Sequence, residues 1–195
     1  MKIKFPTRVL LALLAALLLP TLAHAHTGAG HGTGLLHGIG HPLGGLDHIL
    51  AMAAVGIWAA QTSDRAVWAV PTTFVTVMAV GGAMGLAGTA IPFVEHGIVM
   101  SVLILGVLIM AAVRLPLAAS AAVIALFALF HGHAHGAETP AALSGVSYGI
   151  GFILTTTVLH VSGIFFGLSL QKSARLQTVQ YAGAAIAAGG VFLLI

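Results

Sequence analysis

Residues 41–52 read HPLGGLDHILAM, and this stretch decides how the rest of the chain is interpreted. It opens a long apolar segment, yet it carries two histidines and the acidic Asp47. Pro42 favours a helix start, because proline is tolerated in the first helical turn. A continuous helix from there would align His41 with His48, with Asp47 to one side of them. Ionisable groups at membrane depth are costly and face a partner or a watery cavity, so the stretch predicts a polar site within an apolar segment.

The composition is that of an integral membrane protein. Of 195 residues, 59% are hydrophobic and only 6% are charged, whereas soluble domains carry about 25% charged residues. The chain has no cysteine, which excludes disulfides and thiolate metal sites. Three of its seven Lys and Arg residues lie within the first eight positions, so the formal charge of +3 gives no support for a nucleic-acid partner.

Residues 1–25, MKIKFPTRVLLALLAALLLPTLAHA, have the pattern of a secretory signal peptide. A basic start precedes a short apolar core, and small residues at Ala23 and Ala25 predict cleavage after Ala25. The mature chain would then begin at His26, outside the cytoplasm. The alternative is a first transmembrane helix, although the apolar run is shorter than the roughly 20 residues that a span needs.

The rest of the chain, residues 26–195, predicts a single all-α domain of six transmembrane helices. The apolar segments cover about 37–60, 66–88, 95–113, 116–133, 142–169 and 177–195, and the connections are short. With His26 outside, the remaining basic residues all fall on the cytoplasmic side, as the positive-inside rule requires. These residues are Arg65, Arg114, Lys172 and Arg175. We therefore expect a multi-pass protein of the inner (plasma) membrane, with its polar chemistry at the outer surface.

A second polar cluster, FHGHAHGAE, ends the fourth apolar segment at residues 130–138. On a helix, His131, His135 and Glu138 share one face, and His133 points roughly the opposite way. Imidazole suits nickel, cobalt, copper and zinc, and a carboxylate neutralises part of the cation's charge. The cluster predicts a divalent-metal surface, with a solvated helix end as the alternative.

Other residues are weaker candidates. Glu95 and His96 open the third segment on the outer side, and His37 with the histidines at 26 and 31 belongs to a His-rich N-terminal stretch. His160 lies about 25 Å along the fifth segment by helical rise, where it could be a second stop for an ion or a proton acceptor; the alternative is a histidine bonded between helices. GVSYG, residues 145–149, resembles a hydrolase elbow but runs into a helix, so no enzyme is expected.

The two motifs together resemble a known family. HPLGGLDHILAMAAVG, residues 41–56, is similar to the signature of the HupE/UreJ family of nickel/cobalt permeases, and FHGHAHGAE is similar to its second His-rich segment. The resemblance implies uptake of nickel, or in some members cobalt, for hydrogenase, urease or cobalamin synthesis. It carries over His41, Asp47 and His48 as metal-site residues, followed by His131, His133, His135 and Glu138.

We therefore predict a secondary transporter that carries nickel or cobalt inward and has no prosthetic group. The clusters would form one outer site if the first and fourth spans pack together through Gly44, Gly45, Gly132 and Gly136. Uptake should then weaken as pH falls through about 6.5, where an unperturbed histidine titrates. Two alternatives remain: a haem protein using two of His48, His96 and His160, or a metal sensor or accessory protein that does not transport. The metal, the energy source and a homo-oligomeric state stay open.

Overall fold

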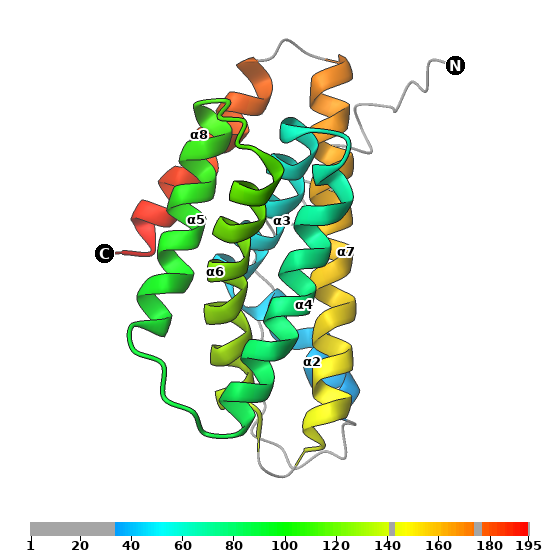
Figure 1. The fold of residues 1–195 in the computed structure, drawn as a ribbon, viewed down its shortest axis with the longest axis vertical. Coiled ribbons are helices and arrows are strands. Elements are labelled where there is room, and N and C mark those ends of the chain that lie inside the picture. Colours follow the sequence, from blue (N-terminus) through cyan, green and yellow to red (C-terminus); the bar gives the residue numbers. More distant parts are fainter. Residues whose placement is uncertain (1–33, 141–142, 174–176, 195) are drawn as a thin grey trace. The chain divides into compact units, whose positions relative to one another are not determined.

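The computed structural model describes residues 34–140, 143–173 and 177–194, and within them every regular element is a helix (Figure 1). This confirms the all-α prediction for the described residues. The predicted signal peptide and the histidines at 26 and 31 lie outside them. The helices are α2 (Gly34–Gly44), α3 (Leu46–Thr62), α4 (Ala66–Leu86), α5 (Val94–Met110), α6 (Leu117–Ala137), α7 (Gly145–Ser173) and α8 (Gln177–Phe192).

Length and apolar composition identify three helices that could cross a membrane, namely α4, α6 and α7. The bent pair α2 and α3 would be a fourth if it is one span, and α5 is a shorter apolar helix. Large apolar side chains are also exposed on the outer faces of the bundle, as lipid contact requires. They include Trp68, Phe165, Tyr181 and Phe192. The six-span count itself stays a prediction.

The predicted helix that starts at Pro42 and continues through His48 is wrong. Pro42 lies inside α2 rather than at a helix start, and the chain turns by 83° between α2 and α3. Proline cannot donate the backbone bond to the preceding turn, and the two glycines that follow have weak helix propensity. Gly45 takes an extended conformation as the N-cap of α3, with φ −111° and ψ 128°. The break therefore places His41 and His48 on two different helices.

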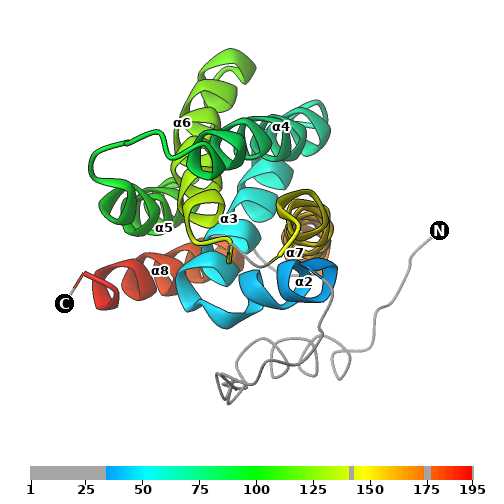
Figure 2. The same cartoon turned by 90° about the horizontal axis from the view of Figure 1, so that it is seen from below.

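Helix α3 runs through the middle of the described helices and contacts α4, α5 and α7 (Figure 2). Its residues from Ala51 to Gln61 are buried almost without interruption. Most of them are small, so neighbouring helices approach closely. A Cβ added to Gly56, for example, would overlap the backbone of α7 at His160 and Ile164. The first polar motif thus leads directly into the core.

The glycines of the second cluster pack differently from our expectation. Gly132 and Gly136 lie against the backbone of α4 at Met78 and Gly82, where an added Cβ would overlap carbonyl oxygens. They therefore hold α6 against α4, and not against the first span. Gly44 has no atom within contact range of an added Cβ. The two polar clusters must be brought together by their side chains.

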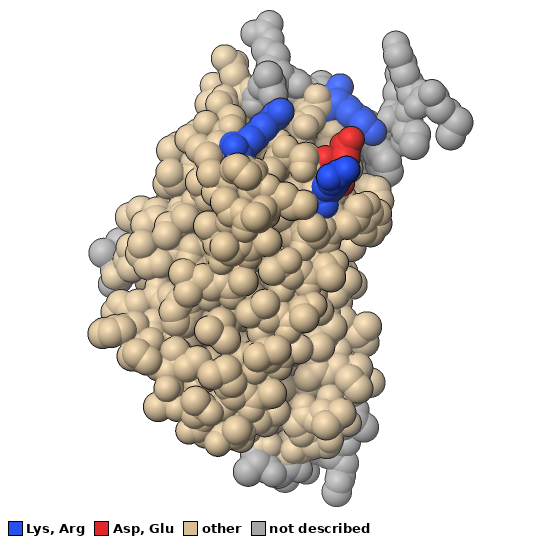
Figure 3. Space-filling model, in the orientation of Figure 1, with Lys and Arg blue, Asp and Glu red and all other residues tan. Residues whose placement is uncertain are grey.

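The described Lys and Arg residues lie toward one end of the bundle. Figure 3 shows them at the upper end of one face, with an acidic side chain beside them and a surface without Lys, Arg, Asp or Glu below. The described basic residues are Arg65 before α4, Arg114 before α6 and Lys172 near the end of α7. Arg175 lies outside the described residues. The arrangement agrees with the predicted asymmetry of the loops.

Candidate metal centre

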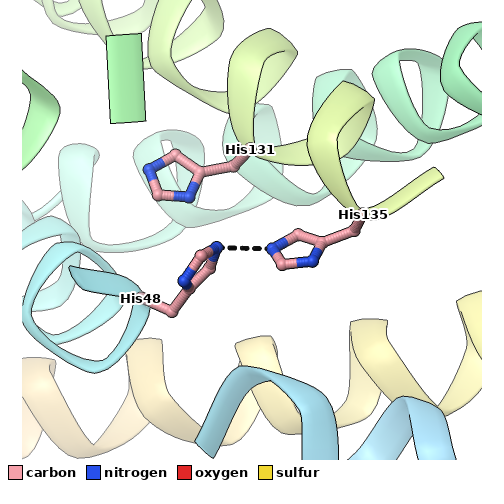
Figure 4. A group of neighbouring side chains, drawn as sticks. All are labelled: His48, His131 and His135. Atoms are coloured by element: carbon pink, nitrogen blue, oxygen red, sulfur yellow. Dashed lines mark hydrogen bonds between the residues drawn. The ribbon is translucent and has the colours of Figure 1, made fainter. Parts of the chain in front are cut away.

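Three buried histidines from two helices converge in the bundle (Figure 4). His48 comes from the first turns of α3, and His131 and His135 come from the last turns of α6. Each offers a ring nitrogen, and these nitrogens lie within 4.8 Å of one another. Nitrogens bound to one ion at about 2.1 Å lie at most about 4.2 Å apart. Small side-chain movements would therefore let this group, the imidazole trio, share a cation.

Asp47 orients the first member of the trio. Its Oδ1 accepts hydrogen bonds from the backbone N–H of His48 at 2.9 Å and from His48 Nδ1 at 2.8 Å. Because a carboxylate can only accept, Nδ1 carries the proton and the lone pair of Nε2 faces the other imidazoles. His135 Nε2 donates to that lone pair. Carboxylates that bond the distal nitrogen of a metal-binding histidine act in this way, so Asp47 orients a ligand and lies outside the ligand groups.

Gly45 makes room for this arrangement. A Cβ at this position would lie 2.9 Å from His48 Nδ1 and would overlap Asp47 Oδ1. A larger residue would therefore displace the carboxylate from the imidazole. Of the two glycines in the motif, Gly45 thus allows the local contact between Asp47 and His48.

His131 is fixed by a serine that the sequence did not single out. Ser101 Oγ donates to the Ile98 carbonyl at 2.6 Å, so it accepts from His131 Nε2 at 2.9 Å. His131 Nδ1 is buried and has no hydrogen-bond partner among the described residues. It is thus available as a ligand atom. Nothing in the sequence pairs a serine of α5 with a histidine 30 positions later.

A second group lies beside the trio and is more open. His41 Nε2 is 3.2 Å from Glu138 Oε2, and His135 Nδ1 is 3.8 Å from the same oxygen. The Glu138 side chain is 52% exposed. We call His41, His135 and Glu138 the mouth group. His135 belongs to both groups, since its Nε2 faces His48 and its Nδ1 faces Glu138.

The two predicted clusters therefore meet, although the glycine contact expected to unite them is absent. The weaker candidates lie outside both groups. His133 Nε2 bonds the Thr89 carbonyl, in agreement with its predicted opposite orientation. His37, Glu95 and His96 are exposed, and His96 contacts Phe93. Within the part of the chain that the structure describes, these are the two groups with metal-ligand geometry.

A cavity of about 230 Å³ adjoins the trio between α4, α6 and α7. Its lining includes His135, Tyr148, Phe152 and Met78. The walls are predominantly apolar, and the Phe152 ring also packs on the His135 ring, tilted by 40°, with centroids 4.1 Å apart. The cavity is thus a second route to His135, in addition to the mouth group.

Comparison with known proteins places the chain in a family. Residues 14–193 match the family model described as HupE / UreJ protein. The chain is 46% identical over 182 residues to "Protein HupE" of Rhizobium leguminosarum bv. viciae, which covers 93% of this chain and 95% of that protein. No solved structure matches the chain.

Proposed function

This chain belongs to the HupE / UreJ family of membrane proteins associated with nickel and cobalt transport, and we propose that it is a permease that moves such a cation into the cytoplasm. Nickel is the first candidate and cobalt the second. The cation is the cargo, taken up through an outward-opening site.

The imidazole trio is the observation that carries this proposal. Three histidines are buried among apolar helices, and Asp47 directs the lone pair of one of them toward the other two. Leaving buried polar groups without a partner is costly, so such a cluster needs a function to explain it. Imidazole nitrogens without thiolates suit borderline divalent cations and allow their release.

His135 can pass the cation between the two groups. In the mouth group it stands with His41 and the exposed Glu138, and in the trio it stands with His48 and His131. The carboxylate of Glu138 attracts a cation from solution and offsets part of its charge. A small rotation of the shared imidazole then exchanges Glu138 for the deeper histidines. A ring nitrogen that carries a proton cannot bind a cation, so His135 Nε2 binds only after its proton shifts to Nδ1, which faces Glu138.

The membrane potential can supply the driving force. With the basic end of the bundle in the cytoplasm, the mouth group faces the outside, and a divalent cation moves with the potential. The gain is about 4.6 kcal/mol at 100 mV, twice the value for one charge. We expect the protein to have this orientation in the inner (plasma) membrane. Hydrogenase, urease or cobalamin synthesis would consume the metal.

Uptake by purified protein in liposomes tests the proposal. Nickel and cobalt are supplied outside in competition, with an inside-negative potential imposed by a potassium gradient. We expect uptake of at least one of them, and its abolition by His48→Ala and Asp47→Ala while membrane insertion is unchanged. Wild-type uptake by both variants would exclude the trio as the transport site.

The alternatives give different results in the same preparation. A metal sensor or accessory protein would bind the cation without moving it. A haem protein would show a Soret band after purification. The cavity beside His135, about 230 Å³, lies below the roughly 300 Å³ from which small-molecule pockets begin. That size favours an ion.

A further inference from the structure

His160, on α7, is buried without a hydrogen-bond partner. Its side chain is 1% exposed, and neither ring nitrogen has a partner among the described residues. Buried imidazoles almost always satisfy at least one nitrogen. An orphaned one therefore indicates either a missing ligand or a function in which the nitrogen must stay available.

Two further atoms of metal-ligand type lie one helical turn from His160 along the contact between α4 and α7. Thr156 lies one turn earlier on α7, and its hydroxyl contacts Met78 Sδ at 3.9 Å. Phe74, one turn from Met78 on α4, contacts the His160 ring with centroids 4.9 Å apart. Thr156, Met78 and Phe74 are all buried. An imidazole, a hydroxyl and a thioether thus gather where α4 meets α7.

This position is connected to the outer groups in two ways. The cavity that borders His135 of the trio is also lined by Met78. In addition, the Phe74 ring that contacts His160 also contacts His131, with centroids 5.7 Å apart. The side chain of Phe74 is therefore all that separates His131 of the trio from His160 along this contact.

The depth of His160 fits an intermediate stop. Val146 lines the cavity, and His160 lies fourteen positions further along the same helix. The helical rise makes this about 21 Å, compared with a hydrocarbon core of about 30 Å. His160 therefore lies beyond the middle of the membrane in the proposed orientation.

We propose that His160, together with Met78 Sδ and Thr156 Oγ1, forms an inner station that receives nickel or cobalt from the imidazole trio. The proposal rests on the transport function proposed above. Imidazole is a ligand for such cations, whereas a thioether is a softer donor, and no carboxylate of the described residues pairs with His160. The station would therefore hold the cation more weakly than the outer groups and release it inward.

A cysteine probe tests whether the cation reaches this depth. The chain has no cysteine, so in His160→Cys any thiolate-to-cobalt charge-transfer absorption must arise at position 160. A bound metal deprotonates a coordinating thiol. The full-length variant in liposomes should show this band when cobalt is added. Val161→Cys is the matched control, because residue 161 is next on the same helix but 43% exposed toward lipid; it should show no band.

Transport by two conservative variants gives the second readout. His160→Leu and Met78→Leu should retain cobalt binding at the trio but lose most of their nickel uptake. If His160→Leu misfolds and loses trio binding, the decision rests on the cysteine band and on Met78→Leu. No band from cysteine 160, or wild-type uptake by folded His160→Leu, would overturn the inner station. If the unsubstituted protein shows no uptake, the transport function is refuted instead. The cysteine band reports metal binding at position 160 and does not depend on transport.

Discussion

Replacing Asp47 by asparagine should weaken metal binding without disturbing the fold. The side chain keeps its shape but loses its charge, and its amide can turn an N–H₂ group toward His48. The Asp47 carboxylate now holds the Nδ1 proton of His48 at 2.8 Å. In the variant nothing enforces that tautomer, so the Nε2 lone pair is directed at the trio for only part of the time.

The size of the effect follows from the hydrogen bond that changes. A bond to a charged partner contributes about 1.5–3 kcal/mol and a neutral one about 0.5–1.5 kcal/mol. The difference of roughly 1–1.5 kcal/mol corresponds to about a tenfold rise in Kd. Loss of the negative charge beside the cation adds to this, and partners of metal-binding histidines typically contribute about 10–100-fold in affinity. We expect Asp47→Asn within that range and Asp47→Ala at its upper end.

Titration of the purified protein in nanodiscs with nickel or cobalt measures this change. Asp64→Asn is the control, since Asp64 lies in the exposed turn between α3 and α4, away from the histidines. Asp47 also lies in the first turn of α3, where a carboxylate contributes only about 0.3–1 kcal/mol through the helix dipole. The thermal unfolding temperature should therefore change little. A wild-type Kd in Asp47→Asn, while His48→Ala has lost binding, would refute an orienting role for Asp47.

Three further outcomes are expected. Gly45→Ala should weaken metal binding, because the new Cβ overlaps Asp47 Oδ1. Gly44→Ala has open space around its Cβ and should bind the metal as before. Titration with nickel or cobalt compares the two variants. Gly132→Ala should lower the free energy of unfolding by about 1–3 kcal/mol, because the new Cβ overpacks against the Met78 carbonyl, whereas the Cβ of Gly149→Ala meets no atom and should leave it unchanged. Denaturant titration in detergent measures both variants, and equal free energies of unfolding would contradict the prediction. Uptake should fall at acidic external pH, because protonated imidazole no longer binds the cation. A rate that stays flat down to the pH at which the protein unfolds would argue against histidine ligands.

Much of the fold could be predicted because the apolar runs end at strong sequence signals. The second and fourth segments, predicted at 66–88 and 116–133, correspond to Ala66–Leu86 and Leu117–Ala137. Charged residues, glycine and proline delimit both of them. The spacing of His131, His135 and Glu138 also holds, since helical periodicity alone brings them to one face.

The bend between α2 and α3 could not be predicted in this way. Pro42 is compatible with the first turn of one helix and with the last turn of another, and the local sequence does not distinguish them. The tertiary contacts decide: Gly38 of α2 packs on the α7 backbone at Tyr148, where an added Cβ would overlap a carbonyl oxygen. Such partners are far away in the sequence, as are Ser101 for His131 and Thr89 for His133.

The bend also accounts for how charge is distributed along the proposed path. Because the helix breaks at Gly45, Asp47 bonds His48 behind the trio, while Glu138 stands at the opposite, exposed side with His41. A divalent cation in the outer groups is thus flanked by two carboxylates, which together offset its charge and favour capture. At His160 no described carboxylate pairs with the imidazole, so a cation there keeps its charge and is held only by neutral donors. Uncompensated charge in an apolar bundle is unfavourable. The membrane potential also acts on the full charge of the cation at this position. Because Asp47 and Glu138 offset the charge of the cation only at the outer groups, the inner position is the one from which it leaves.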